Sequence, residues 1–422
     1  MSPTWLTTEK IMKSYSLAMA FATCLLCNPI SVLAATPPVT PTIEQLWDII
    51  QAQQAEIEAL KKQQHDTAQK AENADEKAEA AVVAVEEVDA KTAGVASWVD
   101  KTTIGGYGEL HYNNFEGEDN ELDLHRFVLF FGHEFTDSIR FFSEFEIEHS
   151  VAGDDEDGEV EVEQAYVEFD LRENLQAKGG VFLMPVGILN ETHEPGTFYG
   201  VERNNVENII VPSTWWEGGG AVNGYFDNGI SWDFAITSGL EMETEGKNAF
   251  RVRSGRQKVS NATANDLAYT GRLKYTGIPG LELAGTASYQ SNATQSNNDG
   301  LNEGILYETH AIYNKGPFGL RALYARWDFN GSAVSAAGDD DQYGWYIEPS
   351  YKPWQKVGLY SRYEKLDGAR DQDQFDQWEV GANYWPHEDV VLKVDYRSRN
   401  VDRNSSGADD IDAFDLGIGY QF

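Results

Sequence analysis

One segment of the chain combines acidic, basic, imidazole and phenolic side chains between two predicted strands. It covers residues 185–216, and its members are Glu191, His193, Glu194, Tyr199, Glu202, Arg203 and Glu207. If this segment lies inside a water-filled channel, its mixed charges form a pore constriction that selects ions electrostatically. On an ordinary external loop the same residues would have no such role. The length of the segment, its apolar residues and its closing pair, Trp215 and Trp216, favour the internal position.

A second group of charged residues, all basic, lies mostly on the polar faces of predicted strands. Its members are Arg126, Arg140, Arg272, Lys274, Arg326, Arg362, Lys393 and Arg397. In a barrel these side chains would line the lumen wall, where two arrangements are open. They could form a basic ladder that guides anions, or each could pair with a neighbouring Glu or Asp across the wall.

The sequence contains no pattern typical of covalent catalysis or of metal binding. The acidic run 154–157 does not match a calcium-binding loop, because Gly153 and Gln164 occupy the two anchoring ligand positions. The eight histidines show no metal-ligand spacing, and no Gly-rich phosphate loop precedes a helix. The strand pattern brings no Ser, His and acid set together. We therefore expect no enzyme activity, no cofactor and no metal.

The strands that would position these charges are clearest at the C-terminus, where residues alternate between two faces. One face consists of Phe414, Leu416, Ile418, Tyr420 and Phe422. The other face consists of Asp415, Gly417, Gly419 and Gln421. One apolar face and one small or polar face is the pattern of a membrane-barrel strand. The terminal aromatic also resembles the assembly signal of such barrels, and we predict that role for Phe422.

The same alternation extends back to about residue 103 and predicts sixteen strands. They are expected at 103–113, 122–135, 138–149, 159–171, 175–184, 217–226, 230–238, 265–276, 281–290, 303–314, 318–330, 342–351, 356–366, 375–385, 390–400 and 411–422. Short and long connections alternate along this series, as in an up-and-down barrel. The predicted fold class is all-β transmembrane, a 16-stranded antiparallel up-and-down β-barrel with an N-terminal α-helical coiled-coil segment. Sixteen strands enclose an aqueous channel.

The residues before the barrel divide into an export signal, a linker and a stalk. Residues 1–35 begin with Lys10 and Lys13, continue through an apolar core and end in a small-residue cleavage site at 32–34, which together predict a signal peptide. A lipoprotein signal that ends at Cys27 is the alternative to this signal peptide. Both cysteines of the chain lie in this segment. The predicted domains are the signal peptide at 1–35, a linker at 36–42, a periplasmic coiled-coil stalk at 43–101 and the outer-membrane barrel at 102–422.

The stalk prediction depends on a heptad pattern. The a positions are Ile43, Ile50, Ile57, Gln64, Ala71, Ala78 and Val85. The d positions are Leu46, Gln53, Leu60, Thr67, Ala74, Ala81 and Val88. Unbroken 3-4 spacing of mostly apolar residues indicates a coiled coil, although the Ala-rich half specifies the number of strands poorly. A flexible, charged, Ala-rich spacer is the alternative.

Composition restricts the partners and the location. A net charge of −37 excludes nucleic acid as a partner, because binding a phosphate backbone requires a basic face. No stretch from Thr36 onward is apolar for eighteen residues, so no helix of the exported chain is predicted to span a bilayer. We expect a place in the outer membrane of a Gram-negative bacterium, with the stalk in the periplasm. The expected partners are outer-membrane lipid, lipopolysaccharide and small hydrophilic solutes.

A long connection between the fifth and sixth of sixteen strands resembles the architecture of trimeric general porins. Short stretches also resemble the phosphate-selective porin O/P family, namely 125–127 (HRF), 163–166 (EQAY) and 198–216. The resemblance covers about residues 102–422. It implies an outer-membrane porin in which the long loop folds into the channel and narrows it. It also implies a homo-oligomer, for which we expect a trimer, and an anion preference that depends on Arg and Lys along the pore.

Composition and resemblance differ on ion selectivity. Residues 102–422 contain 24 Lys and Arg against 55 Asp and Glu. Carboxylates at the channel mouth enrich cations over about a Debye length, ~8 Å at physiological salt. We therefore expect a wide pore with a modest cation preference at low salt. Two other functions remain as alternatives, a structural tether from the barrel to the cell wall and an outer-membrane barrel hydrolase.

Overall fold

The computed structural model describes residues 42–43, 47–48, 51–65, 79, 98–117, 119–153, 158–296, 300–401 and 410–422. The chain divides into two compact units, Met1–Val88 and Asp89–Phe422. In the first unit, residues 51–65 are helical and exposed. The predicted signal peptide and most of the predicted stalk lie outside the described residues, so the coiled coil stays a prediction. None of the described helices is both long enough and apolar enough to cross a membrane.

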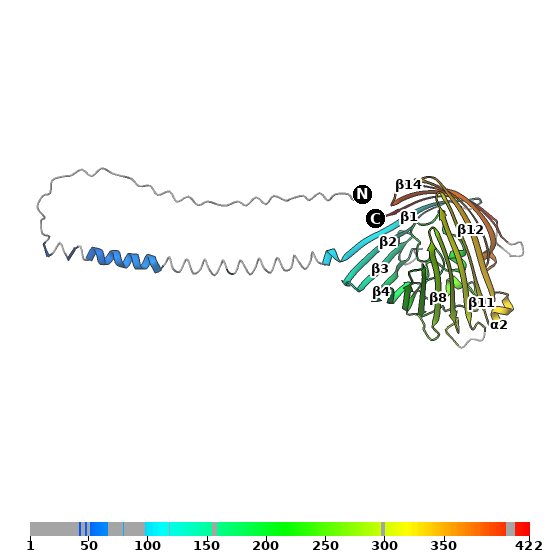
Figure 1. Cartoon of the computed structure of the whole chain (residues 1–422), viewed down its shortest axis with the longest axis horizontal. Coiled ribbons are helices and arrows are strands. Elements are labelled where there is room, and N and C mark those ends of the chain that lie inside the picture. The colour runs from blue at the N-terminus through cyan, green and yellow to red at the C-terminus, as the bar shows by residue number, and fades with distance from the viewer. Residues whose placement is uncertain are drawn as a thin grey trace. The chain divides into compact units, whose positions relative to one another are not determined.

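The second unit contains sixteen strands, as the period-two pattern predicted (Figure 1). They are β1 (Thr102–Phe115), β2 (Glu121–Thr136), β3 (Ile139–Glu148), β4 (Val160–Arg172), β5 (Leu175–Leu183), β6 (Trp216–Tyr225), β7 (Ile230–Thr237), β8 (Ala268–Ile278), β9 (Leu281–Gln290), β10 (Gly304–Lys315), β11 (Phe318–Phe329), β12 (Asp341–Trp354), β13 (Val357–Asp367), β14 (Gln374–His387), β15 (Val390–Val401) and β16 (Ile411–Gln421). Short helical turns occur in the connections at η1 (Val206–Ile210), η2 (Val252–Gly255), α2 (Ser332–Ala337) and η3 (Asp371–Asp373).

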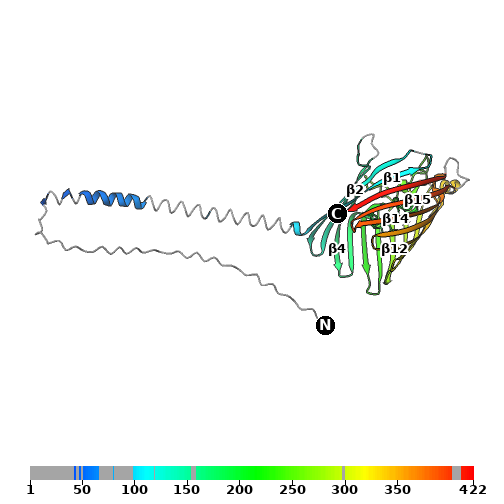
Figure 2. The same cartoon turned by 90° about the horizontal axis from the view of Figure 1, so that it is seen from above.

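Each strand pairs antiparallel with its neighbour in sequence, and β1 pairs with β16 to close the barrel. Figure 2 shows the C-terminal strand beside β1 at this closure. The sequence prediction of a closed 16-stranded antiparallel barrel is therefore confirmed. Strand ends differ from the predicted ones by a few residues, and β12 continues to Trp354 because its pairing with β13 resumes after an irregularity.

The two faces of each strand have different surroundings, as β16 illustrates. Phe414 and Leu416 are 43% and 42% exposed on the outer surface, whereas Asp415 between them is fully buried on the inner side. A barrel whose outer face is aliphatic and aromatic and whose inner face is polar matches a lipid environment outside and a polar lumen inside. The charged strand residues singled out in the sequence therefore belong to the lumen.

Two long connections place apolar residues inside the barrel. We call residues 184–215, between β5 and β6, the inner loop, and residues 238–267, between β7 and β8, the second loop. They meet in one buried cluster with inward residues of the wall. Members of this cluster include Val206, Ile210 and Trp215 of the inner loop, Leu240, Met242, Phe250 and Val252 of the second loop, and Leu323 and Tyr346 of the wall. The second loop is one of the long connections of the predicted alternating series, and its buried apolar residues show that part of it packs into the lumen.

The C-terminal residue takes part in barrel closure. The Phe422 amide donates to the Gly106 carbonyl at 2.9 Å, and the Gly106 amide donates to the Phe422 carbonyl at 3.0 Å. The Phe422 ring also stacks near Phe127, with ring centroids 6.3 Å apart. The last residue is thus part of the β1–β16 seam. These contacts are compatible with an assembly role for Phe422, which remains a prediction.

Deleting Phe422 should lower the amount of folded barrel in the outer membrane. The deletion removes two main-chain hydrogen bonds, each worth about 1 kcal/mol net, and an aromatic contact at the strand pair that closes the barrel. The measurement is the fraction of heat-resistant barrel in outer-membrane preparations on unboiled gels. Phe422→Tyr, which keeps a terminal aromatic ring, is the matched control. Wild-type yield after the deletion would contradict an assembly role.

Candidate functional site

The inner loop crosses the lumen from one side of the wall to the other. Thr214 donates to Glu163 on β4 at 2.7 Å, and Glu207 accepts from Tyr346 on β12 at 2.9 Å. In the closed order, β4 and β12 are half of the barrel apart. Further contacts with wall residues are those of Thr286 with Pro185, Arg321 with Thr197, Lys393 with Gly200, Asp395 with Val201 and Glu364 with Asn205.

Glycines on β16 permit the close approach of this loop. A Cβ atom on Gly419 would lie 2.4 Å from the Cβ of Pro195, and one on Gly417 would lie 3.1 Å from Val201. The first distance is far shorter than any real Cβ contact, and the second is tight. The small residues that the sequence places on the polar face of β16 are therefore the surface on which the inner loop rests.

One buried carboxylate organises the inner loop. Glu207 is fully buried, and its Oε1 accepts the amides of Ile188 at 2.6 Å and Leu189 at 2.7 Å. Its Oε2 accepts from the hydroxyl of Tyr346 at 2.9 Å and from the amide side chain of Asn204 at 3.1 Å. Three of these four donors are N–H groups, which can only donate, and the two carboxylate oxygens supply the acceptors that they need. Glu207 thus joins both arms of the loop to the wall.

The other predicted constriction residues are held in different ways. Glu191 pairs with Arg272 of β8, and the Tyr199 ring stacks on Tyr360 of β13, with centroids 5.2 Å apart. Glu202 accepts from His111 of β1. Glu194 and Arg203 form no ion pair within the described part of the chain, and Arg203 reaches only a backbone carbonyl, that of His193, at 3.4 Å. Most members of this set thus fasten the loop, whereas within the described residues Glu194 and Arg203 have neither an ion pair nor the set of side-chain hydrogen bonds that holds Glu207.

The environment of Glu202 shows how strongly these charges interact. Burial alone would raise the pKa of this carboxyl group. The charge of His111 and its hydrogen bond, 3.0 Å long, outweigh burial and hold the pKa of Glu202 well below its usual range. Glu202 is therefore ionised at neutral pH, and its charge attaches the loop to His111 of β1.

Seven of the eight predicted wall cations contact carboxylates. These contacts are those of Arg126 with Glu109 and Glu146, Arg140 with Glu168 and Asp170, Arg272 with Asp233 and Glu191, Lys274 with Glu282, Arg326 with Asp328 and Asp341, Arg362 with Glu348 and Glu379, and Arg397 with Asp415. Lys393 instead donates to the Gly200 carbonyl at 2.8 Å and lies 3.6 Å from the Phe198 ring centroid. The geometry thus corresponds to the pairing alternative rather than to a free ladder.

Three arginines of the second loop were missed by the sequence analysis. Arg253 donates to the Ser213 carbonyl at 2.6 Å, and Arg256 donates to the Pro212 carbonyl at 3.2 Å, so both contact the inner loop through neutral groups. Arg251 is nearby, 3.9 Å from the carboxylate of Asp373. Burial, followed by the charges of Arg256, Arg251 and Arg203, lowers the pKa of Arg253. Three basic residues within 251–256 were a signal, but the sequence analysis gave this long connection no role.

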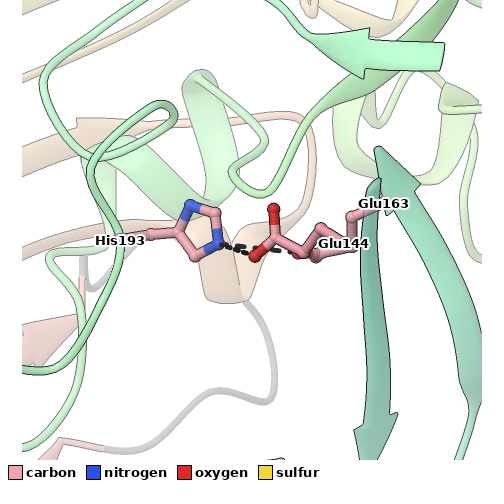
Figure 3. Close-up of side chains that lie close together, drawn as sticks. All are labelled: Glu144, Glu163 and His193. Atoms are coloured by element: carbon pink, nitrogen blue, oxygen red, sulfur yellow. Dashed lines mark ion pairs between the residues drawn. The ribbon is translucent and has the colours of Figure 1, made fainter. Parts of the chain in front are cut away.

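A cluster that joins three separate elements was also missed. His193 of the inner loop directs Nε2 at Glu144 of β3, 3.4 Å away, and at Glu163 of β4, 3.5 Å away (Figure 3). Burial would lower the pKa of His193, but the two carboxylates raise it to about 9. No local motif could reveal this cluster, because its members are brought together only by strand pairing and by the path of the loop.

Comparisons with known proteins agree with this geometry. The family model for phosphate-selective porin O and P matches residues 104–422. An uncharacterised protein of Aquifex aeolicus (strain VF5) is 32% identical over 342 residues, which cover 70% of this chain and 74% of that protein.

Solved structures with the same fold include several outer-membrane channels. Salmonella typhi OmpF in complex with daunomycin has a TM-score of 0.53 at 13% identity, and the match covers 76% of this chain and 97% of OmpF. The anion-selective porin from Comamonas acidovorans has a TM-score of 0.52 at 12% identity, and the match covers 76% of this chain and 99% of that porin. The likeness to these structures concerns the fold. Together with the family match, these findings show that the chain is an outer-membrane porin channel and not an enzyme, and that it belongs to the phosphate-selective porin O and P family.

Proposed function

We propose that this porin passes small hydrophilic solutes and ions through a water-filled lumen that the inner loop narrows. The observation that supports this proposal is the attachment of the loop to opposite sides of the wall, at Glu163 of β4 and at Tyr346 of β12. A loop held at both sides of the wall reduces the open cross-section of the lumen. Glu194 and Arg203 form no ion pair with any residue that the structure describes, and they are therefore the members of the loop best suited to act on passing ions.

We further propose weak selectivity, set by two opposing groups of charges. The paired wall residues contribute little net field, because each cation lies against one or two carboxylates. Arg203, Arg253 and Arg256 contact neutral carbonyls and favour anions near the inner loop. The acidic outer connections, of which residues 339–341 are an example, favour cations at the mouth. The balance of the two should depend on salt, since salt screens exposed charges more than partly buried ones.

Single-channel recording in planar lipid bilayers tests the proposed function. Purified full-length protein should produce discrete conductance steps, and reversal potentials in a potassium chloride gradient should report the preference between cation and anion. A barrel that inserts but carries no current would contradict the channel and favour the tether alternative. Deletion of residues 43–101 separates the two functions further, because a channel should keep its conductance after loss of the stalk.

The proposed assembly is a trimer whose stalk lies in the periplasm and forms a coiled coil. A structure of in-vitro folded OmpT from Vibrio cholerae, described as its trimer form, has a TM-score of 0.51 to this chain. The described helical residues 51–65 contain the heptad positions Ile57 and Leu60, which are exposed in a single chain and would be covered in a coiled coil.

Chemical cross-linking in mild detergent should give a three-chain species. The stalk should add to contacts between barrels rather than create them, so deletion of residues 43–101 should weaken the trimer without abolishing it. The measurement is the mass of the cross-linked and uncross-linked particles. A purely monomeric particle before and after deletion would contradict this assembly.

A further inference from the structure

The cluster of Glu144, Glu163 and His193 has the geometry of a metal site. All three side chains are at most 3% exposed, and their donor atoms lie within 4.8 Å of one another. The three converging atoms, His193 Nε2, Glu144 Oε1 and Glu163 Oε2, have no hydrogen bond of normal length among the described residues, and the imidazole nitrogen faces the two carboxylate oxygens across 3.4 and 3.5 Å. Buried polar atoms without partners are rare and require an explanation. Here all three point to the same place (Figure 3).

The remaining polar atoms of the same side chains are fixed by other groups. Glu144 Oε2 accepts from Gln164 at 2.6 Å, and Glu163 Oε1 accepts from Thr214 at 2.7 Å. His193 Nδ1 lies 3.2 Å from the carbonyl of Asn190, to which it can donate its proton, and a metal bound at Nε2 would replace the proton that this nitrogen carries between the two carboxylates. Metal-binding histidines almost always donate their other ring nitrogen in this way, and metal-binding carboxylates are themselves hydrogen-bonded.

The distances also fit a shared ion better than a direct ion pair. Charged N–H···O contacts are normally about 2.7–2.9 Å long. His193 Nε2 is instead 3.4 Å from Glu144 and 3.5 Å from Glu163. Two ligands on a tetrahedral Zn²⁺ with bonds of about 2.0–2.1 Å are about 3.3 Å apart. The observed separations therefore leave room for an ion between the three atoms.

Two other buried histidines of the same barrel provide a contrast. His310 lies 2.7 Å from Glu308 through Nδ1 and 3.2 Å from Glu282 through Nε2. His111 likewise uses one ring nitrogen for each of two carboxylates. Each ring nitrogen in these pairs has its own acceptor, as expected for an imidazolium ion. Only at His193, among the described histidines, does one nitrogen face two carboxylates while the other faces a carbonyl.

Charge balance supports the same assignment. Two buried carboxylates and an imidazolium leave one negative charge, whereas two carboxylates, a neutral imidazole and a divalent cation sum to zero. Arg126 pairs directly with Glu109 at 2.9 Å and Glu146 at 3.2 Å, and Arg203 reaches the His193 carbonyl at 3.4 Å, so neither arginine forms a direct ion pair with Glu144 or Glu163 among the described residues. Buried charge that lacks compensation is costly.

We propose that Glu144, Glu163 and His193 form a zinc site that fastens the inner loop to strands β3 and β4. An imidazole with two carboxylates suits Zn²⁺ better than Mg²⁺ or Ca²⁺, which prefer oxygen ligands throughout. The site joins His193 of the loop to two neighbouring strands, so bound zinc stabilises the loop in its position across the lumen. This inference departs from the sequence expectation of no metal, and it does not depend on which solute the channel passes.

The test is the zinc content of the full-length barrel after refolding with zinc chloride or with a chelator. The wild type should retain stoichiometric zinc after desalting and unfold at a higher temperature than the chelated protein, because a ligand bound only by the folded state stabilises it. His193→Ala and Glu144→Gln should lose both effects. His310→Ala, which removes a buried histidine from the other kind of pair, should keep zinc binding. Cobalt(II) should give a visible absorption spectrum in the wild type that is absent in His193→Ala.

Three outcomes would overturn the proposal. The first is wild-type zinc no higher than that of His193→Ala, with both barrels heat-resistant. The second is loss of zinc on substitution of His387, which lies with Glu388 and Asp389 on an exposed turn; that result would indicate an adventitious ion only. The third is equal stabilisation by magnesium, which would exclude a site with a nitrogen ligand. None of these results bears on conductance, so a failed zinc site and a failed channel are distinguishable.

Discussion

Glu207→Gln should raise the single-channel conductance and make the current level fluctuate, because the substitution releases the inner loop from the wall. The substitution preserves the size of the side chain but replaces one acceptor oxygen with an NH₂ group. All four partners of Glu207 are donors, the amides of Ile188 and Leu189, the Asn204 side chain and the Tyr346 hydroxyl. At least one of these N–H donors must then face the new NH₂ group in a buried site, even if the Tyr346 hydroxyl rotates to accept from that group.

The expected size of this effect follows from the bonds that are lost. Hydrogen bonds to a charged group contribute about 1.5–3 kcal/mol each, and a buried donor left without an acceptor costs about 1–3 kcal/mol. Loss of about 3 kcal/mol would raise the population of the released loop about 100-fold. The strands do not depend on Glu207 for their pairing, so the barrel itself should remain heat-resistant. The change should therefore be confined to the channel.

Conductance recording and limited proteolysis of the inner loop check this prediction together. Tyr346→Phe is the matched control, since it removes one of the four donors and leaves the carboxylate intact. It should give a smaller increase in conductance than Glu207→Gln. An unchanged conductance in Glu207→Gln, with the loop still protected from protease, would show that the apolar cluster around Val206 and Ile210 holds the loop without Glu207.

The barrel could be predicted from the sequence because its determinants are local. In β16, Phe414, Asp415 and Leu416 alternate between lipid and lumen, and the same period of two marks the other strands. A membrane barrel needs this alternation in every strand, so strand number and order follow from it directly. The inner loop was also recognisable, since its length exceeds that of a turn and it ends in Trp215.

The partners of individual charges could not be predicted in the same way. Arg272 pairs with Glu191, 81 residues earlier in the chain, and Glu144 and Glu163 meet His193 only after β3, β4 and the loop are in place. These contacts depend on strand register and on the path of a loop, neither of which leaves a pattern in the sequence. The burial of Arg253 was missed for the same reason.

Ion selectivity should respond differently to charges at the mouth and charges at the inner loop. Asp339 and Asp340 lie in the connection between β11 and β12, where α2 ends. Burial and the charges of Asp340, Asp367 and Asp371 raise the pKa of Asp339 to about 6. Asp339 is thus charged at pH 7 and becomes neutral as the pH falls below about 6. The acidic run 154–157 has the same sign of charge but lies outside the described residues.

Replacing Asp339 and Asp340 with Asn should reduce the cation preference at low salt and have little effect at high salt. Carboxylates at the mouth act over about one Debye length, ~30 Å at 0.01 M salt and ~3 Å at 1 M. Lowering the pH from 7 to 5 should shift the wild type in the same direction, because protonation of Asp339 removes one negative charge. The double variant should show a smaller shift with pH than the wild type. The measurement is the reversal potential in salt gradients of equal ratio.

Arg203→Ala should instead increase the cation preference at every salt concentration. Arg203 is partly buried on the inner loop and forms no ion pair within the described residues, so mobile ions screen it poorly. Arg172→Ala removes the same charge from an exposed position at the end of β4 and is the matched control; its effect should be small and vanish as salt rises. An Arg203→Ala channel that differs from the wild type only at low salt would place Arg203 outside the narrowest part. A wild-type channel that is strongly anion-selective and saturated by phosphate at low concentration would show that Arg203, Arg253 and Arg256 outweigh the acidic mouth.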